Sequence, residues 1–260
     1  MWLPIFRNYI YYQCRLRKAF YSFRKCYSYF YQKLLSMQQT PAQNHNRNNI
    51  SSFILVLALI SVWFSLVVQF CISIPAYIND GRSLPGTLVQ LFSYFTIQVN
   101  LLAGLGLGAL LLKPSTAFNK YFSQEYVLTG IALYITIVGL VYNIILRSLW
   151  HPIGLFKLTD ELMHLINPIL FVVYWLIFVP KERLKWTQSL SWLWFPFLYL
   201  VYILIRGAIT QIYPYPFIDA GKLGYYSIII HSLLLLVVFL LLGLLLILLT
   251  RTLSPKSSTP

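Results

Sequence analysis

Six apolar stretches of this sequence are each long enough to cross a lipid bilayer. They cover roughly residues 52–77, 88–112, 126–149, 160–179, 189–209 and 225–250. Crossing the hydrocarbon core takes about 20 apolar residues at a rise of about 1.5 Å per residue. The segments between them are short and hold most of the proline, lysine and arginine. The sequence therefore predicts an all-α, polytopic membrane protein with six transmembrane helices and no room for a soluble catalytic domain.

The composition agrees with this class of protein. The chain is 58% hydrophobic and 10% charged, whereas about 25% of a soluble domain is charged. Its net charge of +14 would suit nucleic acid. The cations of the bundle, however, are scattered at interfacial positions, where they normally attract anionic lipid headgroups. We expect a membrane lipid or amphiphilic ester as the partner and no nucleic acid; the sequence does not indicate an oligomeric state.

The distribution of lysine and arginine predicts the orientation. The N-terminal tail, the 113–125 and 180–188 loops and the C-terminal tail hold 15 of these residues, and the opposite side holds five. Basic loops stay on the cytoplasmic side, so we expect both termini inside the cell and a location in the plasma (inner) membrane. Eight of the 15 lie in the first 50 residues, and without them the count is seven against five.

Three segments are expected from the polarity of the chain. Residues 1–50 contain no Asp or Glu and form a basic, aromatic and polar tail, 51–250 form the bundle, and 251–260 form a disordered C-terminal tail. Two interpretations of residues 1–36 remain open: an anchor lying on the membrane surface, or a mis-assigned extension before a true start at Met37.

Polar side chains recur at helical spacing in three of the predicted spans. The stripes are Ser93, Thr96 and Asn100; Asn143 and Arg147; and Asp160, His164 and Asn167. Positions three and four apart share one helix face, and strongly polar groups in a span usually face a protein interior or a wet cavity. All three stripes lie toward the same predicted side of the membrane, so we expect a buried polar site in the outer half of the bundle.

Thr96 and His164 are the candidate catalytic pair in this site. A threonine hydroxyl becomes a useful nucleophile when a base takes its proton, and imidazole is the usual base. Asp160 lies one turn before His164 and is a possible orienting acid, as the third member of a triad is. The alternative for Thr96 is structural, because a threonine in a span commonly hydrogen-bonds to its own helix or to a neighbour.

Further polar residues have candidate roles around this pair. Possible oxyanion, carboxylate-binding or pocket residues are Asn100, Asn143, Arg147 and Arg206. Asn143 and Arg147 have the alternative of pairing only with Asp160 or Asp219. His231 is a weaker candidate, and the Tyr213–Phe217 segment is either a rigid aromatic cap or a lid over the site. No ligand set has metal spacing, so we expect no metal and no cofactor.

Three segments resemble the androgen-induced protein (ADTRP-like) family of six-span membrane proteins. They are YFTIQVNLL at Tyr94–Leu102, DELMHLINPILF at Asp160–Phe171 and RGAITQIYPYPFID at Arg206–Asp219. The F-T-x-Q-x-N motif, together with Pro180, Lys181 and Trp186, makes the chain more similar to the bacterial branch of this family. The resemblance covers roughly residues 52–250.

The resemblance implies a fold and an activity. The animal members are six-span intramembrane hydrolases that cleave fatty acid esters of hydroxy fatty acids through a threonine and a histidine. Thr96 and His164, with Pro168 after the latter, match those positions, although the spacing from Thr96 to Asn100 departs locally from the family pattern. The family gives Asp160 no catalytic role, and the bacterial branch has no settled activity.

The leading expectation is a threonine-dependent hydrolase of lipid esters with His164 as the base. The main alternative is a non-catalytic membrane carrier or lipid-binding protein with a polar pocket in the outer leaflet. A purely structural partner subunit is a third.

Overall fold

The computed structural model describes residues 41–112, 116–180 and 184–253, and in these ranges it is helical, with turns and no strand. The all-α prediction is therefore confirmed. Residues from Ser51 onward form one compact unit, and the description below concerns this unit. The predicted tails fall mainly on residues 1–40 and 254–260, outside the described ranges, and the helix that contains the first span already begins at Pro41.

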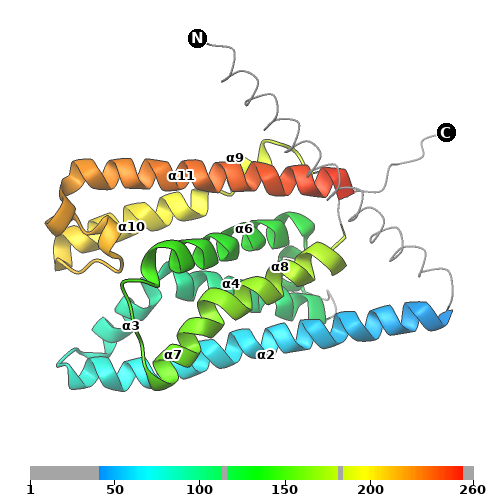
Figure 1. Cartoon of the computed structure of the whole chain (residues 1–260), viewed down its shortest axis with the longest axis horizontal. Helices are drawn as coiled ribbons and strands as arrows, with labels where there is room; N and C mark the ends of the chain where they lie inside the picture. Colours follow the sequence, from blue (N-terminus) through cyan, green and yellow to red (C-terminus); the bar gives the residue numbers. More distant parts are fainter. Residues whose placement is uncertain (1–40, 113–115, 181–183, 254–260) are drawn as a thin grey trace, which may run out of the picture. The chain divides into compact units, whose positions relative to one another are not determined.

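The helices overlap the predicted spans, although several begin or end at other residues than predicted (Figure 1). The elements are α2 (Pro41–Asn79), α3 (Leu84–Phe92), α4 (Phe95–Leu111), α5 (Ala117–Phe122), α6 (Glu125–Val141), η2 (Tyr142–Leu146), α7 (Gly154–Glu161), η3 (Leu162–Ile166), α8 (Asn167–Phe178), α9 (Gln188–Ser191), α10 (Trp194–Thr210), η4 (Pro216–Ile218) and α11 (Ala220–Leu253). Segments η2 and η3 are π-helical and η4 is a 3₁₀ turn.

Five stretches of the described chain are long and apolar enough to cross a membrane. Each falls on one of the predicted spans. The α3–α4 pair makes a sixth stretch only when it is counted as one span, because the two helices are bent by 73° at their junction. The prediction of a continuous helix over residues 88–112 is therefore wrong.

Side-chain hydrogen bonds explain the break between α3 and α4. The Ser83 hydroxyl accepts the Gly86 N–H at 3.2 Å and caps the start of α3. At the C-terminal end of α3, the Phe92 carbonyl accepts a hydrogen bond from the Gln98 side chain at 2.7 Å instead of one from a backbone N–H. Tyr94 is extended, with ψ at 123°, so α4 begins afresh at Phe95. Ser93 is thereby removed from the helix that carries Thr96.

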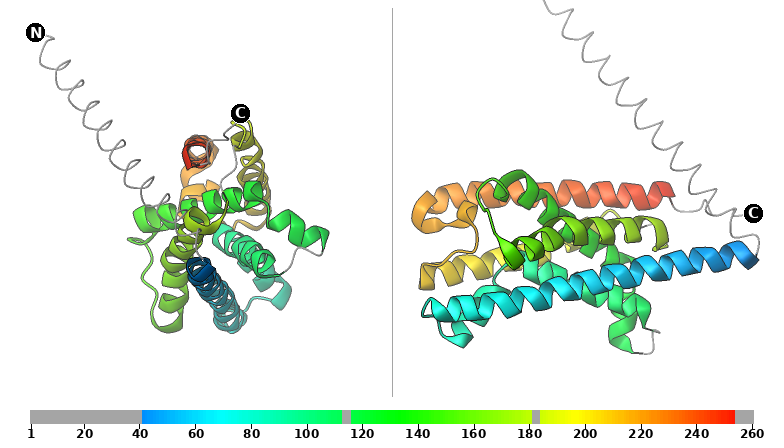
Figure 2. Two further views of the ribbon diagram at one scale, coloured as in Figure 1. Left: turned by 90° about the vertical axis from the view of Figure 1, so that its right-hand side faces the viewer. Right: turned by 60° about the horizontal axis from the view of Figure 1, so that its bottom comes forward.

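Helix α6 is the centre of the bundle. Of its span, 67% is buried, against 17–33% in the other long spans. It packs against α4, α8 and α11, and the views in Figures 1 and 2 show it between α11 and α2. Close packing extends to α2, because a Cβ at Gly104 of α4 would lie 3.1 Å from the Trp63 ring. The π-helical segment η2, which continues α6, contacts η3.

Candidate active site

Thr96 and His164 meet where the first turn of α4 faces η3. The Thr96 Oγ1 and His164 Nε2 atoms are 3.2 Å apart. Thr96 is 8% exposed, and the His164 side chain is 13% exposed. The two groups therefore lie within hydrogen-bonding distance in a largely enclosed position.

The surroundings of the other ring nitrogen, His164 Nδ1, determine whether Thr96 or His164 donates the proton in this hydrogen bond. His164 Nδ1 lies 2.9 Å from the Asp160 carbonyl oxygen and 3.2 Å from the Asp160 carboxylate Oδ1. Both are acceptors, so Nδ1 carries the proton in the neutral ring, and Nε2 is left with a lone pair. The Thr96 hydroxyl therefore donates to Nε2. This is the arrangement in which a histidine can take a proton from a hydroxyl.

Tyr142 of η2 completes the surroundings of the imidazole. Its ring stacks on the His164 ring with centroids 3.9 Å apart and planes 16° from parallel. Its hydroxyl donates to Asp160 Oδ2. Tyr142 therefore restrains both the plane of the base and the carboxylate that orients it. Sequence reasoning missed this residue, because one more tyrosine among apolar residues carries no distinctive signal.

Pro168 and η3 free two backbone carbonyls beside the base. Residue 168 has no N–H to donate to the His164 carbonyl four residues earlier. In η3 the Asn167 N–H bonds to the Leu162 carbonyl, which leaves the Met163 carbonyl without that partner. Asn143 Nδ2 donates to the His164 carbonyl at 3.1 Å, and Asn100 Nδ2 lies 3.4 Å from the Met163 carbonyl. Two asparagines from other helices thus hold the turn that carries His164.

Asn100 also ties this turn to the threonine. Its Nδ2 donates to the Thr96 carbonyl at 2.9 Å, and its Oδ1 accepts from Asn167 Nδ2 at 2.9 Å. Asn167 reaches α2 as well, donating to Ser65 Oγ at 3.0 Å and accepting from Ser61 Oγ at 2.6 Å. Helices α2, α4 and α8 are linked through these amides at the level of Thr96 and His164.

Several residues that the sequence suggested as pocket or oxyanion-binding groups make other contacts in the structure. Asn100 and Asn143 bind backbone carbonyls rather than an open pocket. Arg147 pairs with Glu161 at 2.7 Å, and not with Asp160 or Asp219 as the alternative had it. Both partners are about a third exposed or more, so this ion pair adds little stability. The π-turn η2 changes the register, which is why a 3.6-residue period misplaced Arg147.

Arg206 is also directed away from the pair. It donates to Gln90 Oε1 at 2.6 Å and to the Ile212 carbonyl at 3.3 Å. Neither Arg147 nor Arg206 lines the two cavities that reach Thr96.

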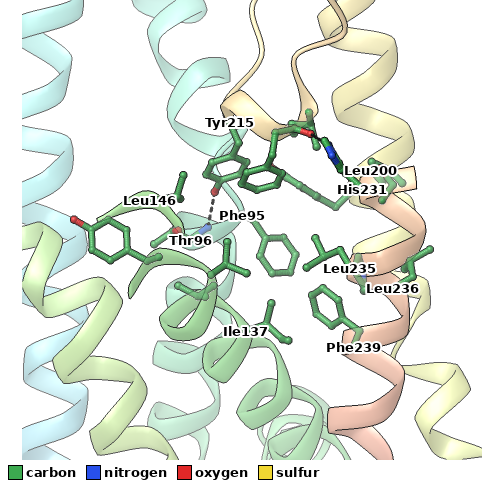
Figure 3. Close-up of a pocket in the computed structure, with 18 of the residues that line it drawn as sticks. Phe95, Thr96, Ile137, Leu146, Leu200, Tyr215, His231, Leu235, Leu236 and Phe239 are labelled. Atoms are coloured by element: carbon green, nitrogen blue, oxygen red, sulfur yellow. Dashed lines mark hydrogen bonds between the residues drawn. The ribbon is translucent and has the colours of Figure 1, made fainter. Parts of the chain in front are cut away.

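Two cavities meet at Thr96 and His164. The larger, of about 500 Å³, has many apolar side chains in its wall but also polar groups that include Gln69, Tyr77 and Asp160, and it is called the polar cavity below. The smaller is a slot of about 80 Å³ lined almost wholly by apolar side chains. Figure 3 shows Phe95, Leu235 and Phe239 around this slot, with Thr96 at its edge. The residues common to both cavities are Thr96, Tyr142, Leu146, His164 and Tyr215.

The loop between α10 and α11 brings Tyr215 to this shared edge. Its hydroxyl oxygen accepts the Thr96 backbone N–H at 3.4 Å, the dashed line in Figure 3. The ring stacks on Phe217 at 5.3 Å, and the His231 ring lies 3.2 Å from the Phe217 carbonyl. Pro214 and Pro216 border the polar cavity beside it. Of the Tyr213–Phe217 segment, residues 214–217 therefore lie over Thr96 and His164, and His231 helps to hold them.

Within the described ranges no group of three or more His, Cys, Asp or Glu side chains is placed to hold a metal ion. The chain matches no protein-family model, no curated protein and no solved structure. The arrangement itself is that of a hydroxyl, a base with a fixed tautomer and an orienting carboxylate, placed between a polar and an apolar cavity. Such a set can perform acyl transfer.

Proposed function

We propose that this protein is a six-span membrane hydrolase that cleaves lipid esters, with Thr96 as nucleophile and His164 as base. The distance of 3.2 Å between Thr96 Oγ1 and His164 Nε2 is the observation that carries the proposal, and the acceptors around Nδ1 support a neutral ring that accepts the hydroxyl proton at Nε2. The termini lie on the cytoplasmic side, following the lysine and arginine count. The site then opens in the outer leaflet. The resemblance to the androgen-induced protein family supports the same reaction class.

The reaction has two stages. As Thr96 Oγ attacks the ester carbonyl carbon, its proton passes to His164 Nε2 and the carbonyl π electrons move to oxygen. The tetrahedral intermediate collapses by breaking the ester C–O bond, and the leaving alcohol takes the proton from His164. Water then attacks the acyl-threonine with His164 again as base, releasing the fatty acid and restoring the hydroxyl. Asp160 stabilises the imidazolium that forms in each stage.

The two cavities indicate the kind of ester. The apolar slot suits a hydrocarbon chain, and the polar cavity suits the other half of the substrate and the attacking water. An ester carbonyl at Thr96 would lie between them. We therefore expect substrates with one apolar acyl chain and a more polar alcohol portion.

A fluorophosphonate probe and a p-nitrophenyl ester test this function on the full chain in detergent. Wild type should be labelled and hydrolyse the ester, whereas Thr96→Ala and His164→Ala should each lose about 10³-fold or more in kcat/KM. Thr136→Ala is the matched control, because the Thr136 hydroxyl binds only its own helix, at the Ala132 carbonyl. Undiminished hydrolysis by Thr96→Ala would rule out the nucleophile.

One observation favours the second candidate, a proton-coupled carrier. Thr96, His164, Asp160 and Tyr142 form a continuous chain of hydrogen-bonding groups beside the large polar cavity. A carrier could pass a proton along such a chain. Uptake of a proton with a bound fatty acid, in the absence of any ester turnover, would favour this function over hydrolysis.

A further inference from the structure

Resting on the proposed hydrolysis, the structure points to an oxyanion-binding role for the loop between α10 and α11. Attack by Thr96 places a negative charge on the former carbonyl oxygen, and acyl-transfer enzymes stabilise it with fixed donors. We propose that the Tyr215 hydroxyl and the Thr96 backbone N–H are those donors, and that Tyr215 is a catalytic residue.

The start of α4 supplies the first donor. The N–H groups in the first turn of a helix have no carbonyl partner within the helix. In α4 the Tyr94 carbonyl accepts from Ile97 and Gln98, which lie after Thr96, and the Tyr94 side chain makes no capping bond. The Thr96 N–H points instead to Tyr215. The bend between α3 and α4 is therefore what exposes this donor beside the nucleophile.

Tyr215 supplies the second donor. Its oxygen accepts the Thr96 N–H at 3.4 Å, which is longer than the usual range of about 2.7–3.2 Å, so the contact is weak. A substrate oxygen that lies beside this contact, at about 2.9 Å from each of the two atoms, would replace it and receive both the N–H and the O–H. Burial raises the pKa of the Tyr215 phenol above its ordinary value, so the phenol keeps its proton and remains a donor.

The other donors near the pair are engaged elsewhere. The Tyr142 hydroxyl donates to Asp160, and the Tyr199 hydroxyl donates to the Ser93 carbonyl at 2.9 Å. Asn100 is held by the Thr96 carbonyl. Tyr215 differs because its hydroxyl oxygen lies against the N–H of the nucleophile itself, and its ring borders both cavities.

The variant Tyr215→Phe keeps the ring that packs on Phe217 and Tyr94 and removes only the hydroxyl. With p-nitrophenyl butyrate, we expect kcat to fall about 10²-fold, the usual effect of losing one such donor, with KM changed less than about threefold. Tyr213→Phe is the matched control on the same loop, since Tyr213 borders neither cavity, and it should retain wild-type kcat.

Inhibitor binding separates an oxyanion donor from a residue that only supports the fold. An alkyl trifluoromethyl ketone forms an adduct with an oxyanion, whereas an alkyl ether of equal length does not. Tyr215→Phe should weaken the ketone about 10²-fold, in step with kcat/KM, and leave ether binding unchanged. Should this variant misfold, 3-fluorotyrosine at position 215 is a stronger donor and should raise the ketone-to-ether affinity ratio.

The outcomes distinguish the two proposals. Suppose that the wild type is active and requires Thr96. If Tyr215→Phe then has wild-type kcat, or if its ketone-to-ether affinity ratio is unchanged, only the role of Tyr215 is overturned. A wild type without Thr96-dependent turnover or ketone binding overturns the hydrolase and this inference with it.

Discussion

The bond between the Asn143 side chain and the His164 carbonyl provides a sharp test of how the site is held. Because Pro168 has no N–H, this carbonyl depends on Asn143 Nδ2 at 3.1 Å. Asn143→Leu keeps the size of the side chain and removes the donor. The bond lies at an exposed position, so removing the donor costs about 0.5–1.5 kcal/mol, the usual net contribution of a hydrogen bond, rather than the larger penalty of a buried unpaired carbonyl. The second acceptor of Asn143, the Gly139 carbonyl, keeps the Tyr142 N–H and should contribute little.

A second substitution should restore what the first removes. Pro168→Ala returns a backbone N–H four residues after His164, where it can donate to the same carbonyl. We expect Asn143→Leu to destabilise the protein by about 0.5–1.5 kcal/mol on its own, and Pro168→Ala to recover most of that loss in this background. Hydrolysis is a separate readout, because a lower free energy of unfolding does not by itself slow a folded enzyme. Loosening of the turn that carries His164 should lower kcat/KM by up to about tenfold in the single variant, and the double variant should regain it.

The assay is a double-mutant cycle of unfolding in SDS–detergent mixtures, with kcat/KM measured in parallel. Pro196→Ala provides the control, because Pro196 lies in α10 and its substitution should add independently to Asn143→Leu. Additivity of Asn143→Leu and Pro168→Ala within about 0.5 kcal/mol would refute the reasoning, since the two residues would then not share a carbonyl.

Three further predictions concern the same site. A Cβ at Gly139 would lie 3.3 Å from the His164 carbonyl, so Gly139→Ala should lower the free energy of unfolding by about 1–3 kcal/mol. At Gly108 the nearest atom, in Leu59, would lie 3.9 Å away, so Gly108→Ala should be neutral. Equal effects of the two substitutions would contradict the close packing of α6 on η3. Leu235→Trp fills the apolar slot, so kcat/KM for p-nitrophenyl palmitate should fall about tenfold or more relative to kcat/KM for p-nitrophenyl butyrate. An unchanged ratio of the two values would place the acyl chain elsewhere. Asp160→Asn should lower kcat only about 10–10²-fold, because the Asp160 backbone carbonyl still accepts the hydrogen bond from His164 Nδ1–H. The corresponding loss in a serine-protease triad is about 10⁴. A loss as large as that of His164→Ala would show that the carboxylate alone fixes the tautomer.

The sequence was sufficient for the helical class, because span length is visible in one dimension. The spacing of polar residues placed Thr96 and His164 toward the same side of the membrane, but whether their helices are neighbours is decided by packing, which the sequence does not record. The break after Ser93 was not visible, because it depends on the Gln98 side chain bonding back to the Phe92 carbonyl. A period of 3.6 residues presumes that no such bond competes.

The partners of the base were hidden for a related reason. The stacking of Tyr142 on His164 and the pairing of Arg147 with Glu161 both follow from two π-turns packed together. Each π-turn adds a residue to one turn and shifts all later side chains around the helix. The position of Tyr215 depends on how a loop folds back over α4, which no periodic pattern records.

Irregular backbone inside a membrane protein persists only where other groups satisfy it, and this explains two residues of the polar stripes. Asn100 and Asn143 bind carbonyls that η3 and Pro168 leave free, so their polarity is accounted for by structure alone.

The same explanation does not cover Thr96. Two threonines in the spans donate to a carbonyl of their own helix, Thr136 to Ala132 and Thr250 to Ile247, whereas Thr159 donates to the Gln69 side chain of α2. The Thr96 hydroxyl instead faces an imidazole nitrogen with a lone pair. Thr96 lies in the first turn of α4, where the helix offers no carbonyl three or four residues earlier, so its hydroxyl bonds to another element in any case. What sets Thr96 apart from the structural asparagines is that its partner is an imidazole nitrogen that can accept a proton rather than a backbone carbonyl, which is the property that the proposed nucleophile requires.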